Sequence, residues 1–201
     1  MKDRIWKKLQ GWKEKLLSKA GKEILIKAVA QSIPTYAMSC FKLPASFCDD
    51  IERIIRNFWW GTSNSEKGIP WKAWRDLCRP KNEGGLGFRD IKSFNDALLA
   101  KQLWRIHCFP NSLLTRSMKA RYFPTGSLWT SKVGLNPSYV WRSVWSSRSL
   151  LERGVRWRVG DGKTIKLWHE AWVSGHGTGK IITPIRVLDS NATVNLSLIH
   201  I

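Results

Sequence analysis

The chain has 201 residues, and 43 % of them are hydrophobic, which allows a packed core and disfavours wholesale disorder. Its formal net charge is +19, from 34 Lys and Arg against 15 Asp and Glu. Because such self-repulsion adds nothing to folding, the charge indicates a polyanionic partner; the alternative is a basic protein with no partner.

The N-terminal segment and the hydropathy pattern argue against a membrane or secreted protein. Charge runs throughout Met1–Trp12, where a signal peptide would need an apolar core. No stretch approaches the roughly 20 apolar residues of a membrane helix. We therefore expect a soluble, intracellular protein with no membrane partner, and a polyanionic partner favours the nucleus.

The first part of the chain predicts three helices. Residues 3–17 place apolar side chains at helical spacing, and Ser18 can cap a second helix over residues 19–33, which Pro34 ends. The expected buried stripe of this second helix is Ile24, Leu25, Ala28 and Val29. Residues 45–60 predict the third helix, with a stripe made by Ile51, Ile54, Ile55, Phe58 and Trp59.

Further helices follow, and the period of the apolar pattern then changes. A short helix contains Trp71, Trp74 and Leu77, and Asp90 caps a long helix that ends near Cys108. Another helix covers residues 111–121, and Ser138 caps one that ends near Glu152. Over residues 155–168 apolar and basic residues alternate around Asp161-Gly162, which predicts a β-hairpin. The expected fold is mainly α with this one hairpin.

The 13 tryptophans are spread along the chain; most should be core residues, and a few could stack on bases. The four cysteines are widely spaced, which favours buried free thiols over a metal site. No zinc-ligand spacing, hydrolase triad or phosphate-binding loop is present. We therefore expect no cofactor.

The motif Phe47-Cys48-Asp49-Asp50 matches the F-x-D-D box with which reverse transcriptases hold Mg²⁺. That box requires a tight turn between apolar strands, whereas here the two aspartates lie inside a helical pattern. Polymerase chemistry also needs a third carboxylate well upstream, and Asp3 is the only aspartate that precedes the pair. We therefore interpret Asp49 and Asp50 as surface helix residues and predict no catalytic residue.

The basic residues are clustered. The segment up to Lys27 holds nine basic and three acidic residues, and no acidic residue occurs from Ala97 to Leu151. Lys and Arg at such density bind phosphates and release counterions, with little sequence readout. The basic residues of the acid-free stretch are Lys101, Arg105, Arg116, Lys119, Arg121, Lys132, Arg142 and Arg148.

Several short sequence motifs occur in a specific order. They are WKEKLLSKAGKEILIK from Trp12, FWWG from Phe58, a long segment from Ile69 to Arg105, and then ARYFP, PSYVWRSVW and VGDGKTIKLWHEAW. Together they resemble the region after the polymerase palm in plant LINE-type (non-LTR) retrotransposon reverse transcriptases and ribonuclease H-like proteins. The resemblance covers about residues 5–190.

This resemblance implies a fragment of an RNA-directed DNA polymerase polyprotein. It implies a thumb-like helical segment over 1–61, a Trp-rich helical connector over 62–190 and a truncated tail over 191–201. The catalytic palm, with its Mg²⁺, would lie upstream, and a zinc-binding module and often an RNase H domain downstream. These modules are the expected partners within the parent polyprotein.

In that family the thumb lies along the primer-template duplex, so the resemblance implies a role in binding nucleic acid. The alternative is an inert transposon-derived remnant or interaction scaffold with no retained activity. The positions that the resemblance carries over as nucleic-acid-binding are Lys13, Lys15, Ser18, Lys19, Gly21, Lys22 and Lys27.

Overall fold

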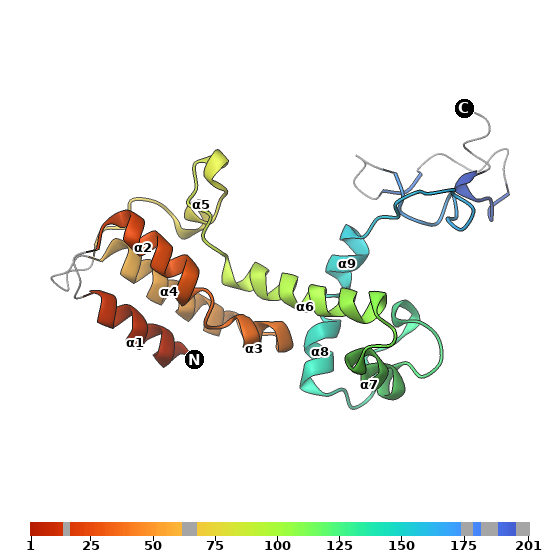
Figure 1. Ribbon diagram of the computed structural model, residues 1–201, viewed down its shortest axis with the longest axis horizontal. Coiled ribbons are helices and arrows are strands. Elements are labelled where there is room, and N and C mark those ends of the chain that lie inside the picture. The colour runs from red at the N-terminus through yellow and green to blue at the C-terminus, as the bar shows by residue number, and fades with distance from the viewer. Residues whose placement is uncertain (14–16, 62–67, 174–178, 182–188, 196–201) are drawn as a thin grey trace. The chain divides into compact units, whose positions relative to one another are not determined.

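The computed structural model describes residues 1–13, 17–61, 68–173, 179–181 and 189–195. The chain is mainly helical, as expected (Figure 1). It forms two compact units, Met1–Arg148 and Ser149–Ile201. These units are defined by packing, so the segment boundaries expected at residues 61 and 190 remain predictions about the modules of a parent protein.

The first helices of unit 1 pack around one hydrophobic core. In chain order they are α1 (Lys2–Lys13), α2 (Lys19–Leu25), a π-helical turn (Ile26–Ala30), α3 (Thr35–Cys40) and α4 (Ala45–Trp60). Both α1 and α2 contact α4 (Figure 1). Ile5 of α1 and Ile51 and Ile55 of α4 are fully buried. Burial of such a side chain contributes about 1.5–3 kcal/mol.

The predicted N-caps of three helices are confirmed. The Ser18 side chain accepts a hydrogen bond from the Gly21 amide at 3.2 Å, and Asp90 accepts one from Ser93 at 2.7 Å. The Ser138 side chain accepts a hydrogen bond from the Trp141 amide at 3.2 Å. A side-chain oxygen at this position satisfies an amide that has no partner inside the helix, so these helix starts follow from local sequence.

The predicted buried stripe of the second helix is wrong. Ile24 is 65 % exposed, whereas Ile26, Ala30 and Gln31 are buried. Two features explain the difference. The side of α2 that faces α4 carries lysines whose ammonium groups bind α4. The backbone N–H of Gln31 donates to the Ile26 carbonyl at 2.9 Å, an i→i+5 hydrogen bond that rotates the following residues relative to an α-helix.

A second cluster of unit 1 forms around a long helix. The elements that follow α4 are α5 (Trp74–Leu77), α6 (Ile91–Cys108), α7 (Leu113–Tyr122), a 3₁₀ turn (Leu128–Thr130) and α8 (Tyr139–Trp145). The first half of α6 completes the N-terminal core, and α6 also contacts α7 and α8. Trp141 is fully buried, and its ring stacks on Tyr122 with centroids 4.7 Å apart.

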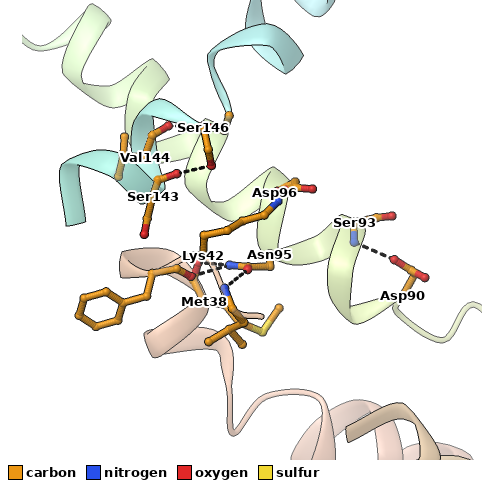
Figure 2. Close-up of polar contacts among 12 residues, drawn as sticks. Met38, Lys42, Asp90, Ser93, Asn95, Asp96, Ser143, Val144 and Ser146 are labelled. Atoms are coloured by element: carbon orange, nitrogen blue, oxygen red, sulfur yellow. Dashed lines mark hydrogen bonds and ion pairs between the residues drawn. The ribbon is translucent and has the colours of Figure 1, made fainter. Parts of the chain in front are cut away.

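A buried amide joins α6 to the chain around α3 (Figure 2). The Asn95 side chain donates to the carbonyls of Met38 at 2.7 Å and Phe41 at 2.9 Å, and its oxygen accepts from the Leu43 amide at 2.8 Å. Beside it, Lys42 forms an ion pair with Asp96. A buried amide with all these partners fixes one register between the two segments.

The β-hairpin expected over residues 155–168 is not formed. Ile165 and Leu167 are buried, as their alternation predicted, but they pair with residues near the end of the described chain. The Leu167 amide donates to Ala192 and the Val194 amide to Ile165, each at 2.9 Å. This leaves one isolated antiparallel bridge among the described residues, between Lys166 and Thr193. The alternation agrees with burial at Ile165 and Leu167, whereas Trp157, in the first half of the pattern, is 52 % exposed. The pattern carries no information about a partner that lies far along the chain.

The helix predicted from Ser138 to Glu152 is interrupted. α8 ends at Trp145, and α9 (Arg148–Gly154) begins after a break. The Ser146 and Ser147 hydroxyls both donate to backbone carbonyls three residues earlier, at 2.7 Å. Such local hydrogen bonds compete with the helical ladder and account for the break.

Candidate nucleic-acid interface

The lysines of α2 bind the C-terminal end of α4. Lys19 Nζ donates to the Trp59 carbonyl at 3.1 Å and lies 5.0 Å from the centroid of the Trp59 ring. Lys22 Nζ donates to the Gly61 carbonyl at 2.6 Å. The last carbonyls of a helix lack intrahelical partners and carry its negative dipole end, so cations placed there stabilise the helix.

Lys27 is also engaged within the protein. Its Nζ donates to Glu23 Oε1 at 2.7 Å and to the Leu86 carbonyl at 2.5 Å. Glu23 receives a second ion pair from Lys81 at 2.9 Å. The hydrogen bonds from Lys27 and Lys81 lower the pKa of the Glu23 carboxyl below its ordinary value of 4.5. Lys27 therefore ties the first helices to the chain that precedes α6.

The remaining expected positions are placed as follows. The Gly21 amide donates to the Ser18 side chain, so these two positions are engaged in the cap of α2. Lys13 ends α1, and its side chain lies outside the described structure, as does all of Lys15. The structure thus brings Lys19 and Lys22 together at one end of α4, and Ser18 caps the helix that carries them.

Exposed cations remain on α1. Arg4, Lys7 and Lys8 are exposed on this helix, whose other side buries Ile5 and Leu9 in the core. This division into a basic and an apolar side is the one that the sequence pattern predicted.

Asp49 and Asp50 lie on the surface of α4, as predicted. Asp50 forms ion pairs with Lys2, at 2.6 Å, and with Arg53. The hydrogen bond from Lys2 is the main cause that lowers the pKa of the Asp50 carboxyl. Asp49 lies 4.0 Å from Lys92. The pair is helical and engaged with cations, which is not the strand-turn geometry of a polymerase F-x-D-D box.

The acid-free stretch folds into the second half of α6, α7, the 3₁₀ turn and α8, and seven of its cations are exposed. No ion pair within the described ranges joins any of these seven to a carboxylate. Positive charge thus accumulates over several consecutive helices. The exposed cations of this basic block are Lys101, Arg105, Arg116, Lys119, Arg121, Lys132 and Arg142.

A row of three rings lies in the basic block, and sequence reasoning did not single it out. His107 packs between Trp104 and Trp129, with centroid distances of 5.3 Å and 5.2 Å. The Trp129 indole N–H donates to His107 Nδ1 at 3.2 Å. Trp104 and His107 are three residues apart on a helix inside the acid-free stretch, a spacing that could have indicated the pair. Trp129 comes from a separate turn, which only the fold places there.

The four cysteines are free, as expected, although only Cys48 is fully buried and Cys108 is exposed. Among the described residues, no three His, Cys, Asp or Glu side chains are grouped so that they could hold a metal ion. No described helix is long and apolar enough to cross a membrane.

Comparisons with known proteins identify two relatives in Arabidopsis thaliana. The chain is 45 % identical over 143 residues to the "Uncharacterized mitochondrial protein AtMg00310", a match that covers 71 % of this chain and 93 % of that protein. It is 39 % identical over 178 residues to the "Putative ribonuclease H protein At1g65750", covering 86 % of this chain but 28 % of that protein. No family model matches the chain. No solved structure matches it.

Proposed function

Since this chain belongs to the same family as the Arabidopsis mitochondrial protein AtMg00310, we propose that it is a non-catalytic, nucleic-acid-binding segment of a transposon-derived, LINE-type RNA-directed DNA polymerase. Its ligand is the sugar-phosphate backbone of a primer-template duplex. The observation that carries the proposal is the basic block, in which exposed cations of three consecutive helices have no carboxylate neighbour in the sequence from Ala97 to Leu151.

The mechanism is neutralisation of phosphates. Each Lys or Arg that contacts a phosphate releases condensed counterions, so affinity falls steeply with salt and depends little on base sequence. Arg can bind a phosphate with two parallel hydrogen bonds, and the basic block holds Arg105, Arg116, Arg121 and Arg142. This contact favours cations that are not bonded within the protein, because an ammonium that is already bonded would first have to leave its partner.

The hydrogen bonds of the α2 lysines help to decide which surface of the protein binds the duplex. Lys19, Lys22 and Lys27 are bonded to backbone carbonyls, so recruiting them to a phosphate costs the stability that these bonds supply. Arg4, Lys7 and Lys8 on α1 carry no such cost. We therefore assign most of the affinity to the basic block and a smaller share to α1, whereas the resemblance to a polymerase thumb had suggested the first two helices.

The test compares two variants that remove the same charge. One replaces Arg116, Lys119 and Arg121 of α7 with Gln, and the matched control replaces Arg4, Lys7 and Lys8 of α1 with Gln. Binding to a labelled RNA/DNA duplex is measured at about 50 and about 200 mM salt. Removal of one phosphate-binding cation reduces the salt slope by about 1, so the α7 variant should show the flatter dependence.

The outcomes separate the possibilities. A larger loss of duplex affinity in the α1 variant would show that the thumb-like segment is the main binding surface. If the folded wild-type chain binds no duplex even at low salt, the proposal is wrong and the inert remnant remains. Unequal binding of duplexes that differ only in sequence would contradict a backbone mechanism.

The remaining modules belong to the proposed parent protein. The chain spans 28 % of the length of its ribonuclease H-named relative. An upstream palm that holds Mg²⁺ and a downstream zinc-binding or RNase H module are therefore proposals about a longer polyprotein. The proposed nucleic-acid partner favours the nucleus, whereas one relative is named mitochondrial. Imaging of a fluorescent fusion of the full chain decides between the two compartments.

A further inference from the structure

The row of three rings in the basic block ends at Trp104, whose ring is partly exposed to solvent. Trp104 is 40 % exposed, although His107 packs against it. A tryptophan of a packed helix normally buries most of its large apolar area. Here His107 is the one ring in the described part of unit 1 that packs against Trp104, and its plane is tilted by 44°; part of the apolar surface of Trp104 faces water.

The row is held in place by contacts that do not involve the open ring. Arg148 donates to the carbonyls of Trp129 and, at 3.2 Å, of Ser131, on either side of the end of the turn that carries Trp129. Ser127 and Thr130 form a reciprocal capping box around the same turn. With Trp129 fixed and donating to His107, the imidazole is oriented against Trp104. The platform therefore exists before any ligand binds, which lowers the entropy cost of binding.

Two exposed cations lie near Trp104 along α6. Lys101, three residues before Trp104, is on the same side of the helix, and Arg105, the next residue, is on the adjacent side. Neither cation is paired with a carboxylate in the residues that the structure covers. An aromatic surface bordered by free positive charge is the combination that binds an unpaired base together with its phosphates.

We infer that Trp104 is a stacking site for an unpaired base of single-stranded nucleic acid, whose neighbouring phosphates bind Lys101 and Arg105. A base inside a duplex has both faces covered, so the ligand is a single-stranded segment, such as the template beyond the end of a primer-template duplex. This inference rests on the proposed binding function and adds to it a second ligand form and a residue.

The experiment uses the full chain and three probes: a duplex, a short oligo(dT), and the same oligonucleotide with abasic sites. Trp104→Ala should weaken oligo(dT) binding by roughly 5- to 150-fold. The same change should leave binding of the abasic strand and of the blunt duplex unchanged, since neither offers a free base. Trp104→Phe keeps a ring and should retain an intermediate affinity. The matched control is Trp71→Ala, because Trp71 is 82 % exposed in the same unit.

The affinities of the variants for the three probes test the stacking site separately from the proposed function. Equal losses of affinity for oligo(dT) and for the abasic strand would show that Trp104 only supports the fold, which would overturn the stacking site. Unchanged oligo(dT) affinity in a folded Trp104→Ala variant would also overturn it, while duplex binding would leave the proposed function standing. If the wild-type chain binds none of the three probes, both proposals fail together.

Discussion

The Nζ of Lys22 lies 2.6 Å from the carbonyl oxygen of Gly61, a residue 39 positions further along the chain. Gly61 ends α4, and the hydrogen bond therefore places a cation at the negative end of that helix. The same ammonium lies 5.7 Å from the centroid of the Phe58 ring. A lysine that the resemblance carried over as a nucleic-acid contact is thus part of the packing of α2 on α4.

Replacement of this lysine should destabilise the protein. Lys22→Met keeps the apolar stem and removes the ammonium, so it tests the hydrogen bond to the Gly61 carbonyl rather than the packing. We expect a loss of about 1 kcal/mol in the free energy of unfolding, measured by urea denaturation. The control is Lys7→Met, which changes an exposed lysine of α1. Equal stability of the two variants would show that the ammonium of Lys22 contributes nothing.

The buried amide of Asn95 should be among the most sensitive polar positions. Asn95 is 1 % exposed and has three hydrogen-bond partners, so Asn95→Ala leaves two carbonyls and one amide without them. We expect a loss of roughly 2–4 kcal/mol in the free energy of unfolding. Asn57→Ala, at an exposed position of α4, is the matched control. A cost below that of the control would mean that water takes the place of the Asn95 amide.

The stability contributed by Glu52 should depend on pH. Burial raises the pKa of this carboxyl above 4.5, although the hydrogen bond from the Ile91 amide opposes the shift. Between 4.5 and the raised folded pKa, the folded state binds more protons than the unfolded state. The contribution of Glu52 to stability is therefore present below 4.5 and lost as the pH rises through the folded pKa. Glu52→Gln should gain stability relative to wild type as the pH rises across this window, in urea unfolding at a series of pH values.

Glu23→Gln is the control of opposite sign for this measurement. The pKa of Glu23 is lowered, chiefly by the hydrogen bond from Lys27, so its contribution is present above 4.5 and lost as the pH falls through the folded pKa. This variant should therefore lose stability relative to wild type as the pH rises. Parallel curves for the two variants would contradict both assignments.

The cysteines should differ in reactivity. Burial raises the pKa of the Cys78 thiol to about 12, and it raises that of Cys48 as well. Because the thiolate is the reactive form, alkylation at mildly alkaline pH should modify the exposed Cys108 first, and Cys48 and Cys78 last. Peptide mass spectrometry after a short exposure measures the order. In guanidinium chloride all four thiols should react at similar rates, and a fast Cys78 in the folded chain would contradict its raised pKa.

Local sequence determined much of the helical framework. The caps by Ser18, Asp90 and Ser138 could be predicted because each depends on a side chain and an amide three residues apart. The range 45–60 and most of its buried stripe were predicted for α4, because period and burial coincide along a single helix. The surface position of Asp49 and Asp50 followed from the same pattern.

The tertiary structure decided which partner each residue has. The pattern that identified Ile165 and Leu167 as buried could not show that they pair with residues 192–194. Nor could it show that Trp129 joins the pair Trp104 and His107, or that Lys19 and Lys22 bind the end of α4. An ammonium group binds water, a phosphate or a carbonyl oxygen with similar chemistry. Which of them it meets depends on the distance between segments far apart in the sequence, and packing of the apolar core sets that distance.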